Sequence, residues 1–135
     1  MRIGGVAAAA LAAEFGTPTR VVDEEDFRTH ASDGPPFQGA KYTVALADRH
    51  APAATAAVTV VGRHCEDEIA RDVDLPADIH PGELLAVAGT GAYHYSMGSC
   101  GNLVGRPPLI AVAGGRSDEL VRRETVADLL ARDCG

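Results

Sequence analysis

The sequence predicts a mainly β fold, a small β-barrel or sandwich with short helices at its two flanks. Five or six short segments are rich in β-branched residues or alternate in polarity, and Pro or Gly bounds them. Long helical patterns are few. The 135 residues fit one domain, and a hydrophobic content of 46% is sufficient for a core that needs no disulfides.

The N-terminal flank is predicted to contain two short helices and a strand between them. Residues 7–15 are rich in Ala and Leu, and Gly16 follows them, which is typical of a helix with a glycine cap. Thr17-Pro18 ends that helix, and the β-branched residues of 19–22 predict a strand. The acidic residues at 23–26 suit the first turn of a second helix, which is expected to be short.

Beyond a segment rich in Ser, Asp, Gly and Pro at 30–39, the pattern of the chain changes to a period of two. Strands are expected at residues 41–46, 57–61, 68–73, 84–88 and 109–113. In the C-terminal tail, Ser117 is interpreted as a helix N-cap. Residues 125–132 predict a helix whose apolar side chains share one face.

Composition restricts the function classes. A formal net charge of −7 disfavours binding to nucleic-acid phosphates and to anionic membranes. Three cysteines form no framework spacing, so a reducing cytoplasm is the expected location. No apolar run reaches the ~20 residues that cross a bilayer, and the Ala-rich run behind Arg2 is not expected to be a signal peptide.

Several segments, taken together and in order, resemble the β-domain of diaminopimelate decarboxylases, which are group 2 decarboxylases dependent on pyridoxal phosphate (PLP). Any one of them alone would be weak evidence. They are Val58–Glu66 with Ile69–Asp72, Pro81–Val87, Gly91–Met97, Arg106–Pro108 and Arg122–Asp133.

The segment Leu11–Arg28 resembles the opening of the same family. The resemblance implies one Greek-key-like β-domain built from both flanks, with a (β/α)₈ barrel of about 250 residues between them in sequence. Here the linker at 30–39 stands in place of that barrel. The expected organisation is a single β-domain over 1–135, with an N-terminal flank (1–29), the linker (30–39) and the C-terminal β-domain (40–135). Surface that the barrel would cover invites a partner or self-association.

The cofactor is expected to be absent from the chain alone. In the family, the barrel supplies the lysine, the phosphate site and the acid that hold PLP, and PLP is the electron sink for decarboxylation. Lys41 is the only lysine of this chain, and it lies in a predicted strand, where a solvated lysine is the ordinary interpretation. PLP is therefore expected only where a partner chain supplies the barrel.

The resemblance implies that the β-domain lends residues to an active site at a dimer interface. Cys65 would reach into the partner's site, Glu66 would meet the distal amino group of the substrate, and Tyr93 would lie near cofactor and substrate. A small buried hydrophobe is the alternative role for Cys65. Two departures weaken this transfer of roles: the loop after Glu66 is shorter than in the family, and Cys100-Gly101-Asn102 lacks the tyrosine that the family commonly has before the asparagine.

Three functional hypotheses follow. The chain is a binding module that docks on a complete decarboxylase as a pseudo-subunit, or a repurposed cofactor-independent enzyme, or an inert product of gene decay. The second would use acid–base side chains for cyclisation, isomerisation or dehydration of a small molecule. Its candidate residues are His64, Glu66, Tyr93, His94 and Tyr95. No metal is expected, because the spacings of His64, Cys65, Glu66, His94 and Cys100 match no standard zinc pattern.

Overall fold

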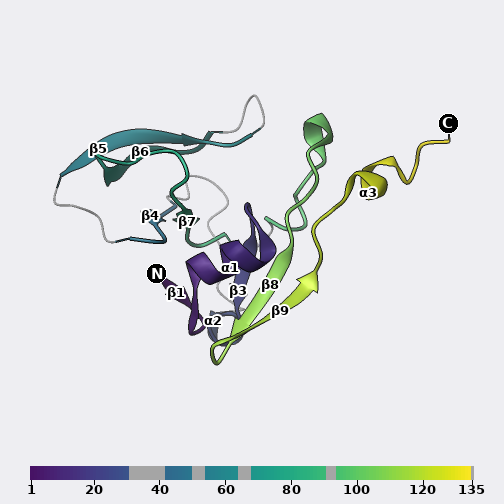
Figure 1. Ribbon diagram of the computed structural model, residues 1–135, viewed down its shortest axis with the longest axis horizontal. Coiled ribbons are helices and arrows are strands. Elements are labelled where there is room, and N and C mark those ends of the chain that lie inside the picture. Colours follow the sequence, from purple (N-terminus) through teal and green to yellow (C-terminus); the bar gives the residue numbers. More distant parts are fainter. Residues whose placement is uncertain (31–41, 50–53, 64–67, 91–93, 135) are drawn as a thin grey trace. The chain divides into compact units, whose positions relative to one another are not determined.

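The computed structural model describes residues 1–30, 42–49, 54–63, 68–90 and 94–134. These residues fall into two compact units, coloured along the sequence in Figure 1. The central unit comprises Gly34–Thr90 with Met1, and the flank unit comprises residues 2–33 and 91–135. The division of the chain into flank, linker and C-terminal part stays a prediction.

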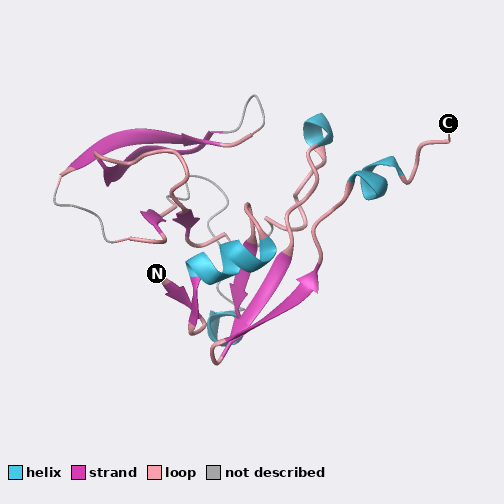
Figure 2. Cartoon of the chain, viewed as in Figure 1, coloured by secondary structure: helices cyan, strands magenta, loops and turns pink. Residues whose placement is uncertain are grey.

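The predicted mainly β class is confirmed. Short strands outnumber helices, as Figure 2 shows, and they pair in several small sheets. Among the described residues these sheets have the orders β1-β2, β3-β8-β9, β4-β7 and β5-β6, and they do not close into a barrel. No helix within the described ranges is long and apolar enough to cross a membrane.

The flank unit contains all the described helices. Its elements are β1 (Arg2–Ile3), β2 (Val6–Ala7), α1 (Ala8–Phe15), β3 (Arg20–Asp23), α2 (Glu24–His30), η1 (Gly101–Leu103), β8 (Leu109–Ala113), β9 (Arg116–Val121) and α3 (Val126–Leu130).

The helix ends follow the local sequence signals. Gly16 ends α1 with a φ of 72°, and its N–H donates to the carbonyl oxygen of Ala12 at 3.0 Å, so the predicted glycine cap is confirmed. At the start of α2, Asp23 Oδ1 accepts the backbone N–H of Glu25 at 3.1 Å. At α3, Thr125 is the N-cap of a capping box with Asp128.

The N-terminal and C-terminal flanks share one sheet and one core. Strand β3 pairs in parallel with β8, from Arg20 opposite Leu109 to Asp23 opposite Val112. Leu11 of α1 packs with Ile110 and Val112 of β8, and each of the three side chains is at most 2% exposed. Burial of such side chains contributes roughly 1.5–3 kcal/mol each, so this cluster is the main source of stability in the unit.

The prediction of a helix beginning at Ser117 is wrong. Residues 116–121 form β9, which pairs antiparallel with β8. The reason lies in the preceding turn: Gly114 and Gly115 have φ values of 55° and 80°, which is the conformation of a two-residue hairpin loop. Because β9 is an edge strand with an exposed face, its polar side chains give no apolar alternation to detect.

The central unit consists of two antiparallel strand pairs. Strand β4 (Val44–Leu46) pairs with β7 (Leu85–Val87), and β5 (Thr55–Val61) pairs with β6 (Glu68–Pro76). All four strands were predicted, with limits that differ by a few residues. Five buried residues form the described interior of this unit, namely Val44, Leu46, Ala47, Leu75 and Pro76.

Candidate functional site

The residues that carry the strongest functional expectation, His64, Cys65, Glu66 and Tyr93, lie outside the described residues. Their roles stay predictions, and so does the acid–base enzyme hypothesis that depends on them. The structure describes the other two candidates, His94 and Tyr95, in the segment that leads from residue 94 to η1.

Tyr95 lies beside an arginine of β3. The guanidinium carbon of Arg20 is 5.7 Å from the centroid of the Tyr95 ring, which is within the range of a cation–π contact. Gly98 leaves room for this packing, because a Cβ there would lie 3.2 Å from Arg20 Nη2 and the guanidinium would have to shift slightly. The Nη1 atom of Arg20 is buried and has no hydrogen-bond partner among the described residues. Tyr95 is therefore placed against a partly desolvated cation.

The surroundings of Arg20 change the pKa of its guanidinium. Burial lowers the pKa of the Arg20 guanidinium, the nearby Tyr95 opposes that effect, and the positive charge of Arg106 adds to it. Arg106 is itself neutralised by an acidic residue. The charges around the segment 94–106 thus depend on the ion pair that Arg106 makes with this acidic residue.

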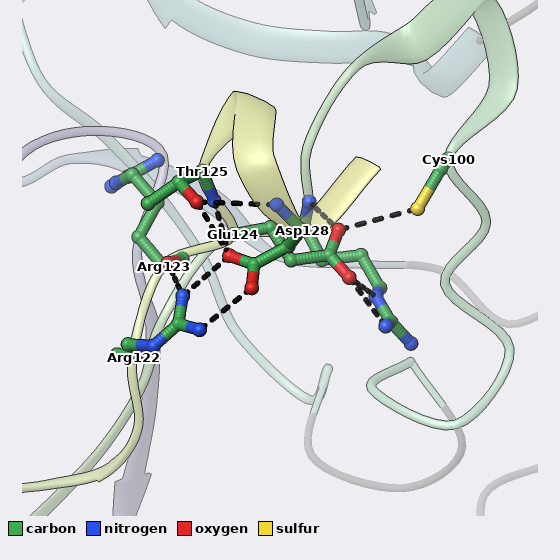
Figure 3. Close-up of polar contacts among 7 residues, drawn as sticks. Cys100, Arg122, Arg123, Glu124, Thr125 and Asp128 are labelled. Carbon is green, nitrogen blue, oxygen red and sulfur yellow. Dashed lines mark hydrogen bonds and ion pairs between the residues drawn. The ribbon is translucent and has the colours of Figure 1, made fainter. Parts of the chain in front are cut away.

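The acidic residue that pairs with Arg106 is Glu124, which also accepts a hydrogen bond from Cys100 (Figure 3). Its Oε2 atom accepts the backbone N–H of Arg106 at 2.7 Å and the thiol of Cys100 at 3.2 Å. Its Oε1 atom accepts Arg106 Nε at 2.7 Å and also Nη2 of the same guanidinium. The pKa of Glu124 falls to about 2, because both the side chain and the backbone of Arg106, and then Cys100, donate to the carboxylate.

The pKa of the Cys100 thiol is raised, whereas that of Glu124 is lowered. The hydrogen bond to Glu124, burial and the negative charge of that carboxylate raise the pKa of the Cys100 thiol, while Arg106 opposes the change. A thiol with a raised pKa stays protonated at neutral pH and is a poor nucleophile. In this arrangement Cys100 donates a hydrogen bond and helps to fix the loop.

The two arginines before Glu124 hold other parts of the flank unit. Arg123 Nη2 donates to the carbonyl oxygens of Phe15 at 3.0 Å and Pro18 at 2.7 Å, and so connects the C-terminal segment to the end of α1. Arg122 makes two contacts with Asp128, at 2.5 and 2.7 Å (Figure 3). Because Asp128 also belongs to the capping box, this ion pair stabilises the start of α3.

The central unit contains a second carboxylate of this kind, Glu83. Its side chain is only 5% exposed and pairs with the guanidinium of Arg49, which also contacts Asp78 at 3.0 Å. The backbone N–H of His80 donates to Glu83 Oε2 at 2.9 Å. The pKa of Glu83 falls to about 2, chiefly through the Arg49 hydrogen bond and next through the His80 N–H.

Sequence reasoning did not single out Glu83, Arg106 or Glu124, although all three lie in the segments that carry the resemblance. For two of them the available signal was a charged residue next to glycine or proline: Glu83 follows Gly82, and Arg106 lies between Gly105 and Pro107. Within the described ranges, no group of three or more His, Cys, Asp or Glu side chains is placed to hold a metal ion.

No protein-family model matches the chain. The diaminopimelate decarboxylase of Actinosynnema pretiosum subsp. auranticum is 52% identical over 101 residues, which cover 73% of this chain. The diaminopimelate decarboxylase of Corynebacterium efficiens is 40% identical over 129 residues, which cover 87% of this chain. The chain belongs to the diaminopimelate decarboxylase family. It spans only 23% and 28%, respectively, of the lengths of these two relatives.

Solved structures of the diaminopimelate decarboxylase family agree with this assignment. The enzyme of M. jannaschii in complex with L-lysine has a TM-score of 0.62 at 30% identity, over 68% of this chain and 21% of that one. The Helicobacter pylori enzyme complexed with L-lysine has a TM-score of 0.60 at 27% identity, over 82% and 27%. The chain is thus a truncated, decarboxylase-like protein of mainly β structure.

The described residues include no lysine, so they do not test the expectation about PLP that the resemblance gives. A Schiff base with PLP needs a lysine, and Lys41, the only one in the chain, lies outside the described ranges. The described carboxylates of the resembling segments are already occupied, Glu83 by Arg49 and Glu124 by Arg106. We derive no chemical step through PLP, and the expectation that the chain alone binds none stays a prediction.

Proposed function

We propose that this chain is a pseudo-subunit, a β-domain that binds a complete diaminopimelate decarboxylase at its subunit interface. There it either lends Cys65 and Glu66 to the site or occupies the place of a normal subunit. The observation that carries the proposal is the parallel pairing of β3 with β8. Both flanks that border the barrel in the family remain folded together, although the chain spans less than a third of its relatives.

The charged contacts support a binding role. Arg106, Glu124 and Cys100 hold the segment 94–106, and Arg49 with Glu83 holds the segment 81–87. Both segments are among those that resemble the family. Both carboxylates are largely buried, with 5% of the Glu83 side chain and 16% of the Glu124 side chain exposed, so these contacts fix the shape of the segments that a partner would meet.

Exposed apolar side chains on the segment 94–106 favour a protein partner. Met97 is 70% exposed and Leu103 is 74% exposed. Leu103 also has a φ of 56°, and Asn102 before it has a φ of 54°, a conformation that costs L-residues about 1 kcal/mol or more. An apolar side chain held in solvent by a strained backbone is better explained by a contact with another protein than by the stability of the chain itself.

Co-purification tests the proposal. The tagged chain is mixed with a complete diaminopimelate decarboxylase, such as that of Mycobacterium tuberculosis, and affinity capture and titration calorimetry are used to measure binding. We expect a complex, and we expect Met97→Asp/Leu103→Asp to weaken it by about tenfold or more, since two apolar contacts are lost. The matched control is Leu120→Asp/Val126→Asp, which changes two exposed apolar residues elsewhere in the flank unit. A chain that never binds the complete enzyme at micromolar concentration contradicts the proposal.

A further inference from the structure

The exposed side chain of Met97 belongs to a short turn of the flank unit, here called the Tyr95 turn (residues 95–98). The backbone N–H of Gly98 closes this turn by donating to the carbonyl oxygen of Tyr95 at 3.2 Å. A single backbone hydrogen bond contributes only modestly to stability. The turn therefore depends on contacts with the rest of the unit if it is to present Met97 in one position.

Arg20, the first residue of β3, contacts both ends of the Tyr95 turn. Its guanidinium carbon lies 5.7 Å from the centroid of the Tyr95 ring. At the other end, a Cβ added to Gly98 would lie 3.2 Å from Nη2 and 3.4 Å from Nη1 of the same guanidinium. The guanidinium thus packs against the residue that donates the closing hydrogen bond and against the residue that accepts it.

The sheet holds Arg20 in place. Arg20 pairs with Leu109 of β8, and its backbone N–H donates to the carbonyl oxygen of Pro108 at 3.1 Å. The Nη1 atom is buried, and burial lowers the pKa of the guanidinium, an effect that Tyr95 opposes. A cation that has lost part of its water interacts more strongly with an aromatic ring. Arg20 is therefore a firm support for the ring of Tyr95.

Leu103, the other exposed apolar residue of the proposed interface, is held by a different arginine. Its backbone N–H donates to the carbonyl oxygen of Cys100 at 3.1 Å. The Cys100 thiol donates in turn to Glu124, which is the ion-pair partner of Arg106. A change at Arg20 is therefore expected to loosen the Tyr95 turn and to leave Leu103 in place.

We infer that Arg20 is a positioning residue of the proposed interface, which fixes the Tyr95 turn so that Met97 meets an apolar site on the complete decarboxylase. This inference rests on the proposed function. In this role Arg20 increases the affinity without contacting the partner, because a turn that is already ordered loses less conformational entropy on binding.

The first measurement uses the full chain alone and follows hydrogen exchange of the Gly98 amide by NMR. Arg20→Gln removes the cation, and Tyr95→Leu removes the aromatic ring. We expect each variant to exchange this amide about fivefold faster than the wild type or more, since the contact that supports the turn is lost. Two variants on opposite sides of one contact keep the test decisive if either of them folds poorly.

Three controls accompany the exchange measurement. Tyr95→Phe keeps the ring and should retain the wild-type rate at Gly98. Arg116→Gln removes the same charge from an exposed arginine of β9 and should also have no effect. The amide of Leu103 should keep its rate in every variant, which distinguishes a local loss of order from unfolding.

The second measurement is the affinity for the complete decarboxylase by titration calorimetry. We expect Arg20→Gln to weaken binding by about three- to tenfold in the wild-type background, but by less than about twofold when Met97 is already alanine. The reason is that the turn of the Met97→Ala chain has no long apolar side chain to present. In a Leu103→Ala background, the full effect of Arg20→Gln should remain.

The two measurements distinguish the inference from the proposed function. Wild-type exchange of Gly98 in both Arg20→Gln and Tyr95→Leu would overturn the inference and leave the proposed function intact. The same holds if Arg20→Gln weakens binding equally with and without Met97. A wild-type chain that does not bind the complete enzyme contradicts the proposed function itself, and with it the role of Arg20 in binding, whatever the exchange rates are.

Discussion

The backbone N–H of Gly115 donates a 2.9 Å hydrogen bond to the carbonyl oxygen of Gly4, and so joins the two Gly-Gly turns of the flank unit. One turn, Gly4-Gly5, connects β1 to β2, and the other, Gly114-Gly115, connects β8 to β9. The turns are in direct contact, because a Cβ added to Gly5 would lie 2.8 Å from the nitrogen of Gly115. The N-terminal hairpin is thereby attached to the central strand of the sheet.

This contact predicts a large destabilisation for Gly5→Ala. The new methyl group would meet backbone atoms that are unable to rotate away, and the φ of 83° is unfavourable for alanine. We expect a loss of roughly 2–4 kcal/mol in the free energy of unfolding, from about 1 kcal/mol of backbone strain and 1–3 kcal/mol of overpacking. Urea denaturation followed by circular dichroism measures it.

The matched control for that variant is Gly114→Ala. Gly114 has a comparable positive φ of 55°, but nothing lies within 4 Å of its added Cβ. It should therefore show the strain alone, about 1 kcal/mol. Equal losses in the two variants would mean that the two turns are not in contact in solution.

A second prediction concerns the reactivity of Cys100. Its hydrogen bond to Glu124 is the largest cause of its raised thiol pKa, so Glu124→Gln should lower that pKa and speed alkylation near neutral pH. The measurement is the pH dependence of the iodoacetamide reaction in a background where Cys65→Ser and Cys134→Ser leave a single thiol. Glu119→Gln, an exposed carboxylate on β9, is the control and should leave the profile unchanged. An identical profile for the Glu124 variant would argue against the contact.

The structure agrees with the sequence where the decisive interactions are local. The Gly16 cap, the helix within residues 125–132 and the apolar strand β8 depend on a few neighbouring residues and were predicted correctly, whereas the N-cap of that helix is Thr125 and not the predicted Ser117. Strand β9 was missed because its polar sequence does not predict a strand, and it is a strand because it pairs with β8. The Gly114-Gly115 pair, typical of a hairpin turn, was the signal that could have revealed it.

The charged contacts could not be predicted in the same way. Arg106 and Glu124 are 18 residues apart, and Arg49 and Glu83 are 34 apart, so no helical or strand period connects them. Their pairing depends on the sheet topology that brings the segments together. The resemblance identified the segments that contain Arg106, Glu83 and Glu124, but it did not indicate which side chains are structural.

Stability should fall in acid because of these carboxylates. Glu83 and Glu124 each have a folded-state pKa of about 2, below the ordinary value of 4.5. The unfolded chain therefore binds more protons than the folded chain between about pH 4.5 and pH 2. The stabilisation is fully present above this window and is lost as the pH falls through it. Thermal unfolding at a series of pH values measures the effect.

The double variant Glu83→Gln/Glu124→Gln is the comparison that shows whether these two carboxylates cause the loss of stability between pH 4.5 and pH 2. Without the two carboxylates, the midpoint of thermal unfolding should be lower at neutral pH and should change less between pH 4.5 and pH 2. A variant with the same acid dependence as the wild type would show that other carboxylates are responsible.

The last prediction concerns PLP itself. Lys41 is the only residue of this chain able to form an internal Schiff base. A lysine in water is almost fully protonated at neutral pH, so it forms such adducts weakly unless a phosphate site and a partner for the pyridine nitrogen hold the cofactor. We expect no stable Schiff-base absorbance when the purified chain is mixed with PLP, and no residue modified after borohydride reduction. Peptide mass spectrometry gives the answer, with Lys41→Arg as the control. A stoichiometric adduct on Lys41 in the wild type would show that the chain builds a cofactor site without the barrel, and the pseudo-subunit proposal would then lose its main premise.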